Sequence, residues 1–331
     1  MTTSSAATAA SPTLVAQIAD RIDPRSVTAG DKAILRFLAA AELIEDDLWQ
    51  QYAELANDNP EFNAALRRID PALVRYVNDD RDDERSHAQL INAFLAAIGE
   101  APVNLDAFRT LPSVDAQGAA REGRLTTLTN LTVDTSWYTR YRGAGNPDFD
   151  DAFAQIVTIT NRPTVPTPDV SKRGQVQAAA HAAAFHFAAI EQGGGSLYAS
   201  LMPKVTSLDV LRILASIGPT EVYHFAAFHK SLEGIFGLTA GDGLVVPDLR
   251  NNRALAEAIF PEPCRFLRND FPLCSVIRPI GTAAAGAQAA ATGLVQSGLF
   301  GQPGQPGGQS PAFFDAVVAL AQAADAATRS C

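Results

Sequence analysis

Cysteine is scarce in this chain of 331 residues, and the few cysteines form no recognisable pattern. Cys264, Cys274 and Cys331 supply neither the even set of a disulfide framework nor the paired spacing of a structural zinc site. Two interpretations of the first two stay open: free thiols, or a Cys264 to Cys274 bridge in an oxidising compartment. The fold must therefore depend on a hydrophobic core, and a hydrophobic fraction of 47% is enough to build one.

Clustered basic residues are also missing. The formal net charge is -10, and no run of Lys or Arg forms the basic stripe that a phosphate backbone requires. Nucleic acid is therefore not an expected partner.

The chain has no recognisable targeting or membrane-spanning segment. Residues 1–30 begin M-T-T-S-S-A-A-T-A-A-S-P, without the basic leader and apolar segment of a signal peptide. We therefore expect a flexible N-terminal segment and a cytoplasmic protein, with an exported form left open. Residues 281–300 carry no charge over a membrane-spanning length, but their Ala, Gly, Gln, Thr and Ser gain little from lipid, so no membrane span is expected.

Helical periodicity is the strongest pattern that is present. Apolar residues recur at intervals of three and four in four long stretches, at about 31–55, 71–99, 172–202 and 207–233. Pro219 lies inside the last stretch and predicts a kink or a break there.

The predicted fold is all-α, an antiparallel four-helix bundle over residues 31–235. Its long crossover connection, at about 100–171, holds a predicted short helix at 126–142 and the Pro-rich run 161–169, which is long enough to cross from one end of a bundle to the other. An irregular C-terminal extension (236–331) follows, with a Gly- and Pro-rich linker and a terminal helix from Pro311 to about Thr328.

Each of the four predicted helices places a carboxylate within its apolar stripe. In chain order these polar residues are Glu42, Glu84 with His87, Glu191, and Glu221 with His224. The Glu-x-x-His spacing turns a helix by about 300°, so both side chains of a pair point to the same side and can hold one metal ion. Four buried carboxylates would repel one another, and two divalent cations would cancel their charge. This ligand set is that of ferritin-like di-iron and di-manganese bundles.

Four segments resemble the ferritin-like domain of desiccation-related proteins, a family related in fold to rubrerythrins and ferritins. They are I-L-R-F-L-A-A-A-E-L at 34–43, D-E-R-S-H at 83–87, I-E-Q-G-G-G-S-L-Y at 190–198 and E-V-Y-H at 221–224. The resemblance covers roughly residues 31–235 and implies metal ligation by Glu42, Glu84, His87, Glu191, Glu221 and His224. The activity of that family is largely unassigned, and its members often carry export signals, which this chain lacks.

Further residues lie close to the candidate ligands along the helices. Asp80, one turn before Glu84, could accept a hydrogen bond from a ligand histidine, and Tyr198, two turns after Glu191, could bind a carboxylate or act as a redox-active phenol. Either residue could also simply belong to the core. Glu45 could replace Glu42 as a ligand, or it could be exposed.

Glycines 193–195 directly follow Glu191, and three glycines in a helix are unfavourable by roughly 2 to 3 kcal/mol relative to alanine. They indicate either a loosened helix beside a ligand or the close approach of another backbone or of a substrate. The remaining histidines, His181, His186 and His229, lie off the main stripes and are interpreted as packed or surface residues.

These patterns indicate a di-metal carboxylate protein with two iron ions, or manganese or a mixed iron and manganese pair, as its expected cofactor. The first hypothesis is a non-haem di-iron oxidoreductase that activates dioxygen or peroxide, or oxidises ferrous iron, in stress protection, with the six candidate ligands as its catalytic residues. The alternatives are metal storage and a structural role in desiccation protection. No flavin, nicotinamide or rubredoxin-like signature is present in the sequence, so any electron donor would be external. We expect a monomer or a small homo-oligomer.

Overall fold

The computed structural model describes residues 12–140, 154–172, 174–250, 272–275 and 286–330. The described part is mostly helical, with two short strand pairs. Its helices and strands are α1 Pro12–Ala19, α2 Ala29–Asp58, α3 Pro60–Ile69, α4 Leu73–Ala97, β1 Leu131–Val133, α5 Trp137–Arg140, β2 Ile159–Arg162, α6 Pro168–Lys172, α7 Val176–Leu201, α8 Leu208–Ser231, β3 Leu238–Thr239, β4 Val245–Val246, α10 Ala287–Gln296 and α11 Pro311–Asp325.

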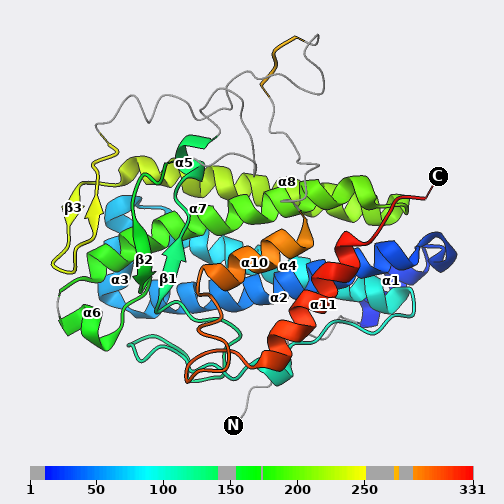
Figure 1. The fold of residues 1–331 in the computed structure, drawn as a ribbon, viewed down its shortest axis with the longest axis horizontal. Helices are drawn as coiled ribbons and strands as arrows, with labels where there is room; N and C mark the ends of the chain where they lie inside the picture. The colour runs from blue at the N-terminus through cyan, green and yellow to red at the C-terminus, as the bar shows by residue number, and fades with distance from the viewer. Residues whose placement is uncertain (1–11, 141–153, 173, 251–271, 276–285, 331) are drawn as a thin grey trace.

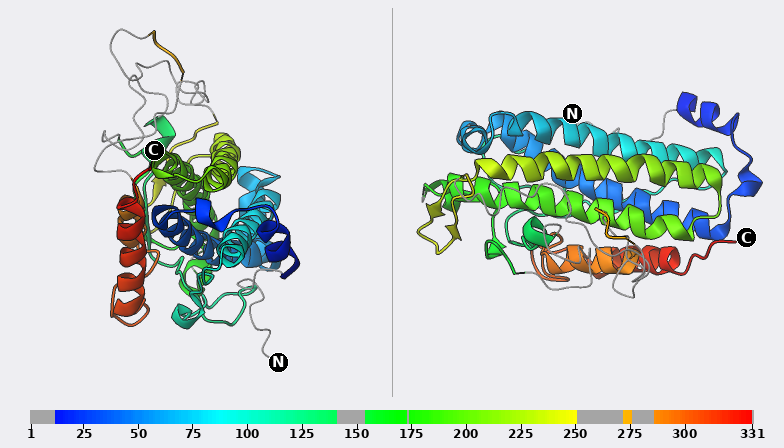
Figure 2. Two further views of the ribbon diagram at one scale, coloured as in Figure 1. Left: turned by 90° about the vertical axis from the view of Figure 1, so that its right-hand side faces the viewer. Right: turned by 90° about the horizontal axis from the view of Figure 1, so that it is seen from above.

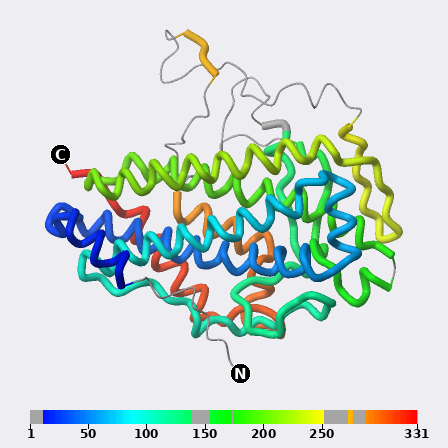
Figure 3. The backbone as a smooth tube through the Cα atoms, turned by 180° about the vertical axis from the view of Figure 1, so that it is seen from behind, coloured from blue at the N-terminus to red at the C-terminus, as the bar shows by residue number. Residues whose placement is uncertain are grey.

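The helices α2, α4, α7 and α8 form an elongated bundle (Figure 1, Figure 2). α2 packs along α4, α7 packs along α8, and α4 also contacts α8. α2 and α8 run in one direction and α4 and α7 in the other, so the chain must cross the length of the bundle between α4 and α7 (Figure 3). The predicted all-α bundle is confirmed, and each of its helices lies within a few residues of the predicted stretch.

Capping explains where α2 begins. Thr28 is the N-cap residue, and its hydroxyl accepts a hydrogen bond from the Asp31 N–H while the Asp31 carboxylate accepts one from the Thr28 N–H. Asp31 also accepts hydrogen bonds from the N–H groups of Thr206 (2.8 Å) and Ser207 (3.1 Å), just before α8. One carboxylate therefore holds the beginnings of two bundle helices together.

The long crossover is anchored to the middle of α2 by Asp47. Asp47 Oδ2 accepts hydrogen bonds from the N–H groups of Leu125 (3.0 Å) and Thr126 (2.9 Å) and from the Thr126 hydroxyl (2.7 Å). Asp47 Oδ1 lies 2.6 Å from Arg109 Nη1. The crossover is thus bonded to the helix that carries Glu42.

The short helix predicted at 126–142 is wrong over most of its length. Leu131–Val133 form strand β1, which pairs antiparallel with β2, and a single helical turn, α5, follows. The run T-T-L-T-N-L-T-V at 126–133 is rich in β-branched residues, which favour extended backbone, and Asp47 fixes its first N–H groups. Residues 141 and 142 lie outside the described part of the chain.

Pro219 lies inside α8 without ending it. A proline cannot donate a hydrogen bond to the carbonyl four residues earlier, here that of Ala215. Both Pro219 and Ala215 are exposed, so water can satisfy the released carbonyl. The predicted break is therefore absent, because the proline is on the solvent face of the bundle.

Two C-terminal helices cover the bundle. α11 packs against α2, while α10 contacts both α11 and α7 (Figure 2). Ser310 caps α11 by accepting a hydrogen bond from the Phe313 N–H. Of the two cysteines in the predicted pairing, Cys274 is exposed and Cys264 lies outside the described residues. Among the described helices, none is long and apolar enough to cross a membrane.

Candidate metal centre

The centre of the bundle gathers ionisable side chains from all four helices. Glu84, Glu191 and Glu221 are completely buried, and Glu42 is almost so. His87 and His224 are also buried. The structure thus brings together all six candidate ligands that the sequence indicated, and divides them, with Asp80, between two adjoining clusters.

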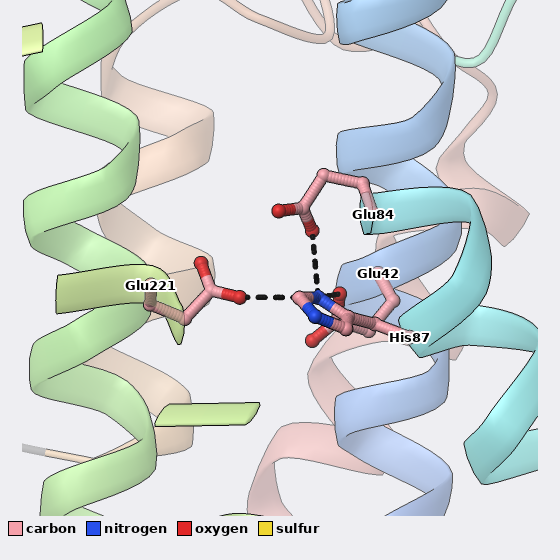
Figure 4. A group of neighbouring side chains, drawn as sticks. All are labelled: Glu42, Glu84, His87 and Glu221. Atoms are coloured by element: carbon pink, nitrogen blue, oxygen red, sulfur yellow. Dashed lines mark ion pairs between the residues drawn. The ribbon is translucent and has the colours of Figure 1, made fainter. Parts of the chain in front are cut away.

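The first cluster contains Glu42, Glu84, His87 and Glu221 (Figure 4). His87 Nδ1 lies 3.4 Å from Glu42 Oε2, 3.5 Å from Glu84 Oε2 and 3.3 Å from Glu221 Oε1. One ring nitrogen carries at most one hydrogen, so it cannot donate to three carboxylates. Ligand atoms about 2.1 Å from a shared cation lie about 3.0 to 3.4 Å from one another, which is close to these separations.

The second cluster contains Asp80, Glu84, Glu191 and His224. His224 Nδ1 lies 2.8 Å from Asp80 Oδ1, 3.3 Å from Glu84 Oε1 and 3.1 Å from Glu191 Oε2. Again three carboxylate oxygens converge on one ring nitrogen. The two clusters have the same composition, three carboxylates and one imidazole.

Glu84 belongs to both clusters. Its Oε2 faces His87 and its Oε1 faces His224, and the centroids of the two imidazole rings are 6.2 Å apart. A carboxylate that directs one oxygen into each cluster is placed to bridge two metal ions.

Many polar atoms of the clusters are buried without a hydrogen bond. These atoms are Glu42 Oε2, both carboxylate oxygens of Asp80, Glu84 and Glu221, and His87 Nδ1. An unpaired buried polar group is unfavourable by about 1 to 3 kcal/mol, and a charged group by more. A cation in each cluster would give these atoms a partner. Carboxylate oxygen with imidazole nitrogen suits iron, manganese and zinc, so the residues present fit a di-metal centre.

Burial dominates the pKa values of the cluster carboxyl groups. It raises the pKa of Asp80 to about 6, that of Glu191 to about 7 and that of Glu221 to about 8. Burial also acts to raise the pKa of Glu42, but the contact with His87 outweighs it, and that pKa is lowered. In the absence of a cation, several of these groups therefore retain protons near neutral pH.

The two histidines and Glu84 show the same competition. Burial alone would lower the pKa of His87, but its contacts with Glu221, Glu42 and Glu84 raise it. The pKa of His224 is raised in the same way by its carboxylate neighbours. Burial, followed by the charges of Glu221 and Glu42, raises the pKa of Glu84 well above its usual range. Metal binding must displace the protons that these groups hold.

The comparison with known families agrees with this arrangement. The family model described as a ferritin-like domain matches residues 30–234, more than half of the chain. The chain belongs to the ferritin-like domain family. No curated protein and no solved structure gave a significant match to the chain. The resemblance to the desiccation-related members of this fold stays a prediction.

Two side chains hold outer carboxylate oxygens of the ferritin-like centre. The Tyr198 hydroxyl donates a hydrogen bond to Glu42 Oε1, and Trp49 Nε1 donates one to Glu191 Oε1 at 3.1 Å. Such contacts orient the carboxylates toward the clusters. Tyr198 was predicted from the sequence and Trp49 was not, although Trp49 lies two turns after Glu42 on the same apolar stripe and its indole N–H needs a partner when buried.

Asp80 and Asp83 contact different nitrogens of His224. Asp80 faces Nδ1, the nitrogen that also faces the other carboxylates, whereas Asp83 Oδ2 lies 3.1 Å from Nε2. Asp80 is therefore a candidate ligand as well as a candidate hydrogen-bond acceptor. Asp83, which sequence analysis did not consider, contacts the outer nitrogen and can fix the tautomer of the ring.

The three glycines of α7 have three different surroundings. A Cβ atom on Gly194 would lie 2.6 Å from Glu221 Oε2, so this glycine makes room for a candidate ligand. A Cβ on Gly195 would lie 3.1 Å from Val222 Cγ2, where α7 and α8 pack closely. A Cβ on Gly193 would meet nothing within 4 Å. The close approach of a neighbouring helix therefore accounts for Gly194 and Gly195, whereas the loosened helix is wrong, because α7 stays helical throughout.

Glu45 and the remaining histidines are outside the two clusters. Glu45 is only 8% exposed, so the interpretation as an exposed residue is wrong. His181, His186 and His229 are also buried. His181 has hydrogen-bond contacts with backbone carbonyls through both ring nitrogens, and His229 packs against the rings of Trp137 and Tyr138.

Proposed function

We propose that this protein binds two metal ions, two iron ions by preference, and acts as an oxidoreductase toward dioxygen or peroxide, with ferrous iron or an organic molecule as the reductant. The observation that carries the proposal is the position of Glu84, which faces both clusters with separate oxygens. Two iron ions held together supply two electrons at once, which avoids a one-electron reduction of dioxygen. Manganese or a mixed pair would suit the same ligands.

The charge of the site supports oxidation rather than inert binding. Asp80 adds a fifth carboxylate to Glu42, Glu84, Glu191 and Glu221. Five ionised carboxylates carry a charge of 5 minus, and two divalent cations carry 4 plus, so the buried site retains one negative charge. A residual negative charge in a buried site would favour metal ions of higher charge over a divalent pair, because unbalanced charge is unfavourable in a low-dielectric environment.

The surrounding residues support a controlled reaction. Tyr198 and Trp49 fix carboxylate oxygens that do not face the cations, and the ring of Trp49 stacks on Phe228 at a centroid distance of 5.2 Å. This packing excludes bulk water from one side of the centre, which strengthens its electrostatic interactions. A role in stress protection is part of the proposal, because consumption of peroxide or ferrous iron limits oxidative damage.

Metal analysis followed by a reaction assay tests the proposal. The full-length protein, purified without added metal, should contain two iron or manganese ions per chain. After anaerobic loading with ferrous iron, addition of dioxygen or peroxide should consume the oxidant and produce ferric absorption within seconds to minutes. Light scattering should show a monomer or small oligomer and not a cage.

Glu84→Gln is the decisive variant, because it preserves side-chain volume but removes the charge shared by both clusters. The variant should fold, as judged by circular dichroism, and its metal content should fall well below two ions per chain. A wild-type protein that binds two ferrous ions but consumes neither oxidant would refute the oxidoreductase. A wild-type protein that binds no metal would refute the metal centre itself.

A further inference from the structure

A cavity of about 310 Å³ lies between α2, β1, α7 and α10, beside the metal centre but outside both clusters. Its wall is largely apolar and includes Phe37, Ala41, Ala189, Ile190, Leu197 and Leu294. α10 comes from the C-terminal part of the chain and contacts α7 (Figure 1). Gly293 of α10 and Ser297, which directly follows this helix, are at least partly exposed, so the cavity can be reached from that side.

The wall also contains two buried polar side chains that the metal clusters do not use, His186 and Glu45. His186 is 2% exposed, and its Nδ1 is hydrogen-bonded to the Tyr52 hydroxyl at 2.8 Å. His186 Nε2, on the other side of the ring, is buried without a hydrogen-bond partner. Burial lowers the pKa of His186 to about 3, so the ring is neutral and can donate or accept one hydrogen bond. An unpaired nitrogen in an apolar wall indicates that a ligand supplies the missing partner.

Glycines enlarge the cavity on two facing helices. A Cβ atom on Gly193 of α7 or on Gly293 of α10 would meet no atom within 4 Å. Neither glycine is therefore required for close packing, and both leave open space at the cavity wall. Gly194 also lines the cavity, but it differs from these two glycines because a Cβ atom there would meet the Glu221 carboxylate. A molecule in the cavity would thus be separated from a candidate ligand by a single glycine.

We infer that this cavity binds one small, uncharged organic molecule that is mostly apolar and carries a hydroxyl or carbonyl group, which bonds to His186 Nε2 near Glu45. An apolar cavity of about 150 Å³ holds one benzene molecule, so this cavity suits about ten to twelve non-hydrogen atoms. No basic side chain is among the described residues that line the cavity, and this disfavours a carboxylate or phosphate. The site would exist whether or not the metal centre is reactive.

Calorimetry with a matched pair of probes tests this inference. 4-Propylphenol has about ten non-hydrogen atoms, and 4-propyltoluene has the same shape without the hydroxyl. With zinc-loaded full-length protein, which cannot undergo redox turnover, 4-propylphenol should bind once per chain. Binding of 4-propyltoluene should be about fivefold weaker, because His186 Nε2 would then stay unpaired. The His186→Phe variant should abolish this difference.

Two variants that fill the cavity from opposite walls provide the structural test. Gly193→Leu and Gly293→Leu should each reduce the affinity for 4-propylphenol at least tenfold, with the melting temperature and metal content retained. Ala215→Leu places the same side chain on the exposed face of α8, with three added carbon atoms instead of four, and should bind the probe like the wild type.

The outcomes separate this site from the proposed function. Absence of binding by both 4-propylphenol and nonan-2-one, a linear ketone of similar size, would overturn the inference, as would unchanged affinity in both filled variants. These measurements use zinc, so they are independent of whether the iron-loaded protein consumes dioxygen or peroxide.

Discussion

Glu221→Gln should have opposite effects on the metal-free and the metal-loaded protein. Glu221 is completely buried, and in the absence of a cation its carboxylate lies among other negative charges. Glutamine has nearly the same volume and no charge. The substitution should therefore stabilise the metal-free bundle and weaken the metal-loaded one.

The expected magnitude follows from the raised pKa of Glu221. The pKa changes from 4.5 to about 8, a difference of about 3.5, and each unit corresponds to about 1.4 kcal/mol. A carboxyl group with a raised pKa in the folded state favours folding less as the pH rises from about 4.5 to about 8. Because the unfolded chain loses this proton more readily than the folded one, the raised pKa of Glu221 lowers the free energy of unfolding by about 3 kcal/mol at pH 7, and by about 5 kcal/mol above pH 8.

Urea unfolding of metal-free protein at pH 4 and pH 7 measures this effect. Metal-free Glu221→Gln should exceed metal-free wild type by about 3 kcal/mol at pH 7 and by less than about 0.5 kcal/mol at pH 4. With excess zinc the order should reverse, because the variant lacks a ligand charge of the first cluster.

Glu45→Gln and Glu61→Gln are the matched controls. Burial and the neighbouring carboxylates also raise the pKa of Glu45, so its variant should stabilise the metal-free protein at neutral pH, yet retain two metal ions. Glu61 is exposed on α3, and its substitution should change stability by less than about 0.5 kcal/mol. If metal-free Glu221→Gln were less stable than wild type at pH 7, the account of repulsion between buried carboxylates would be wrong.

Three more predictions concern the metal centre. Glu42→Gln and Glu191→Gln should each lose one metal ion of two by mass spectrometry, because each belongs to one cluster; loss of both ions would contradict that division. Gly194→Ala should lower metal affinity, because its added Cβ would displace an oxygen of Glu221. Gly193→Ala should instead raise the free energy of unfolding, measured by urea unfolding, by up to about 1 kcal/mol. Similar behaviour of both variants would contradict the contacts of α7. Zinc loading at pH 7 should release roughly four protons per chain in a pH-stat, since the raised pKa values keep several ligands of the metal-free protein protonated. Acidification below about pH 5 should release the bound metal, because protons then compete for the same ligands.

The long helices and the six candidate ligands were predictable because each is a local property of the chain. A stripe of period 3.6 and a Glu-x-x-His pair are both readable within a few turns. The predicted helix at 126–142 failed because a contact from a distant residue, Asp47, and a strand partner override local preference. Glu45 was misjudged for a similar reason, since it shares a cavity wall with α10, which comes more than 200 residues later in the chain.

The partners of the ligands could not be predicted from spacing alone. Trp49 and Asp83 reach Glu191 and His224 across the bundle, at distances that depend on how helices pack. The cavity is less predictable still, because its wall combines four elements from separate parts of the chain. Only the unusual glycines beside Glu191 pointed toward it.

The anchoring of the crossover by Asp47 has a consequence for folding kinetics. Its hydrogen bonds to Leu125 and Thr126 join positions 78 and 79 residues apart. Such contacts close a long loop and form late, whereas α2, which carries Asp47, can pair early with α4, its partner nearby in the sequence. The crossover should therefore lock onto a preformed helical hairpin, and its amide protons at 125 and 126 should exchange with solvent only when the α2 region opens as a unit.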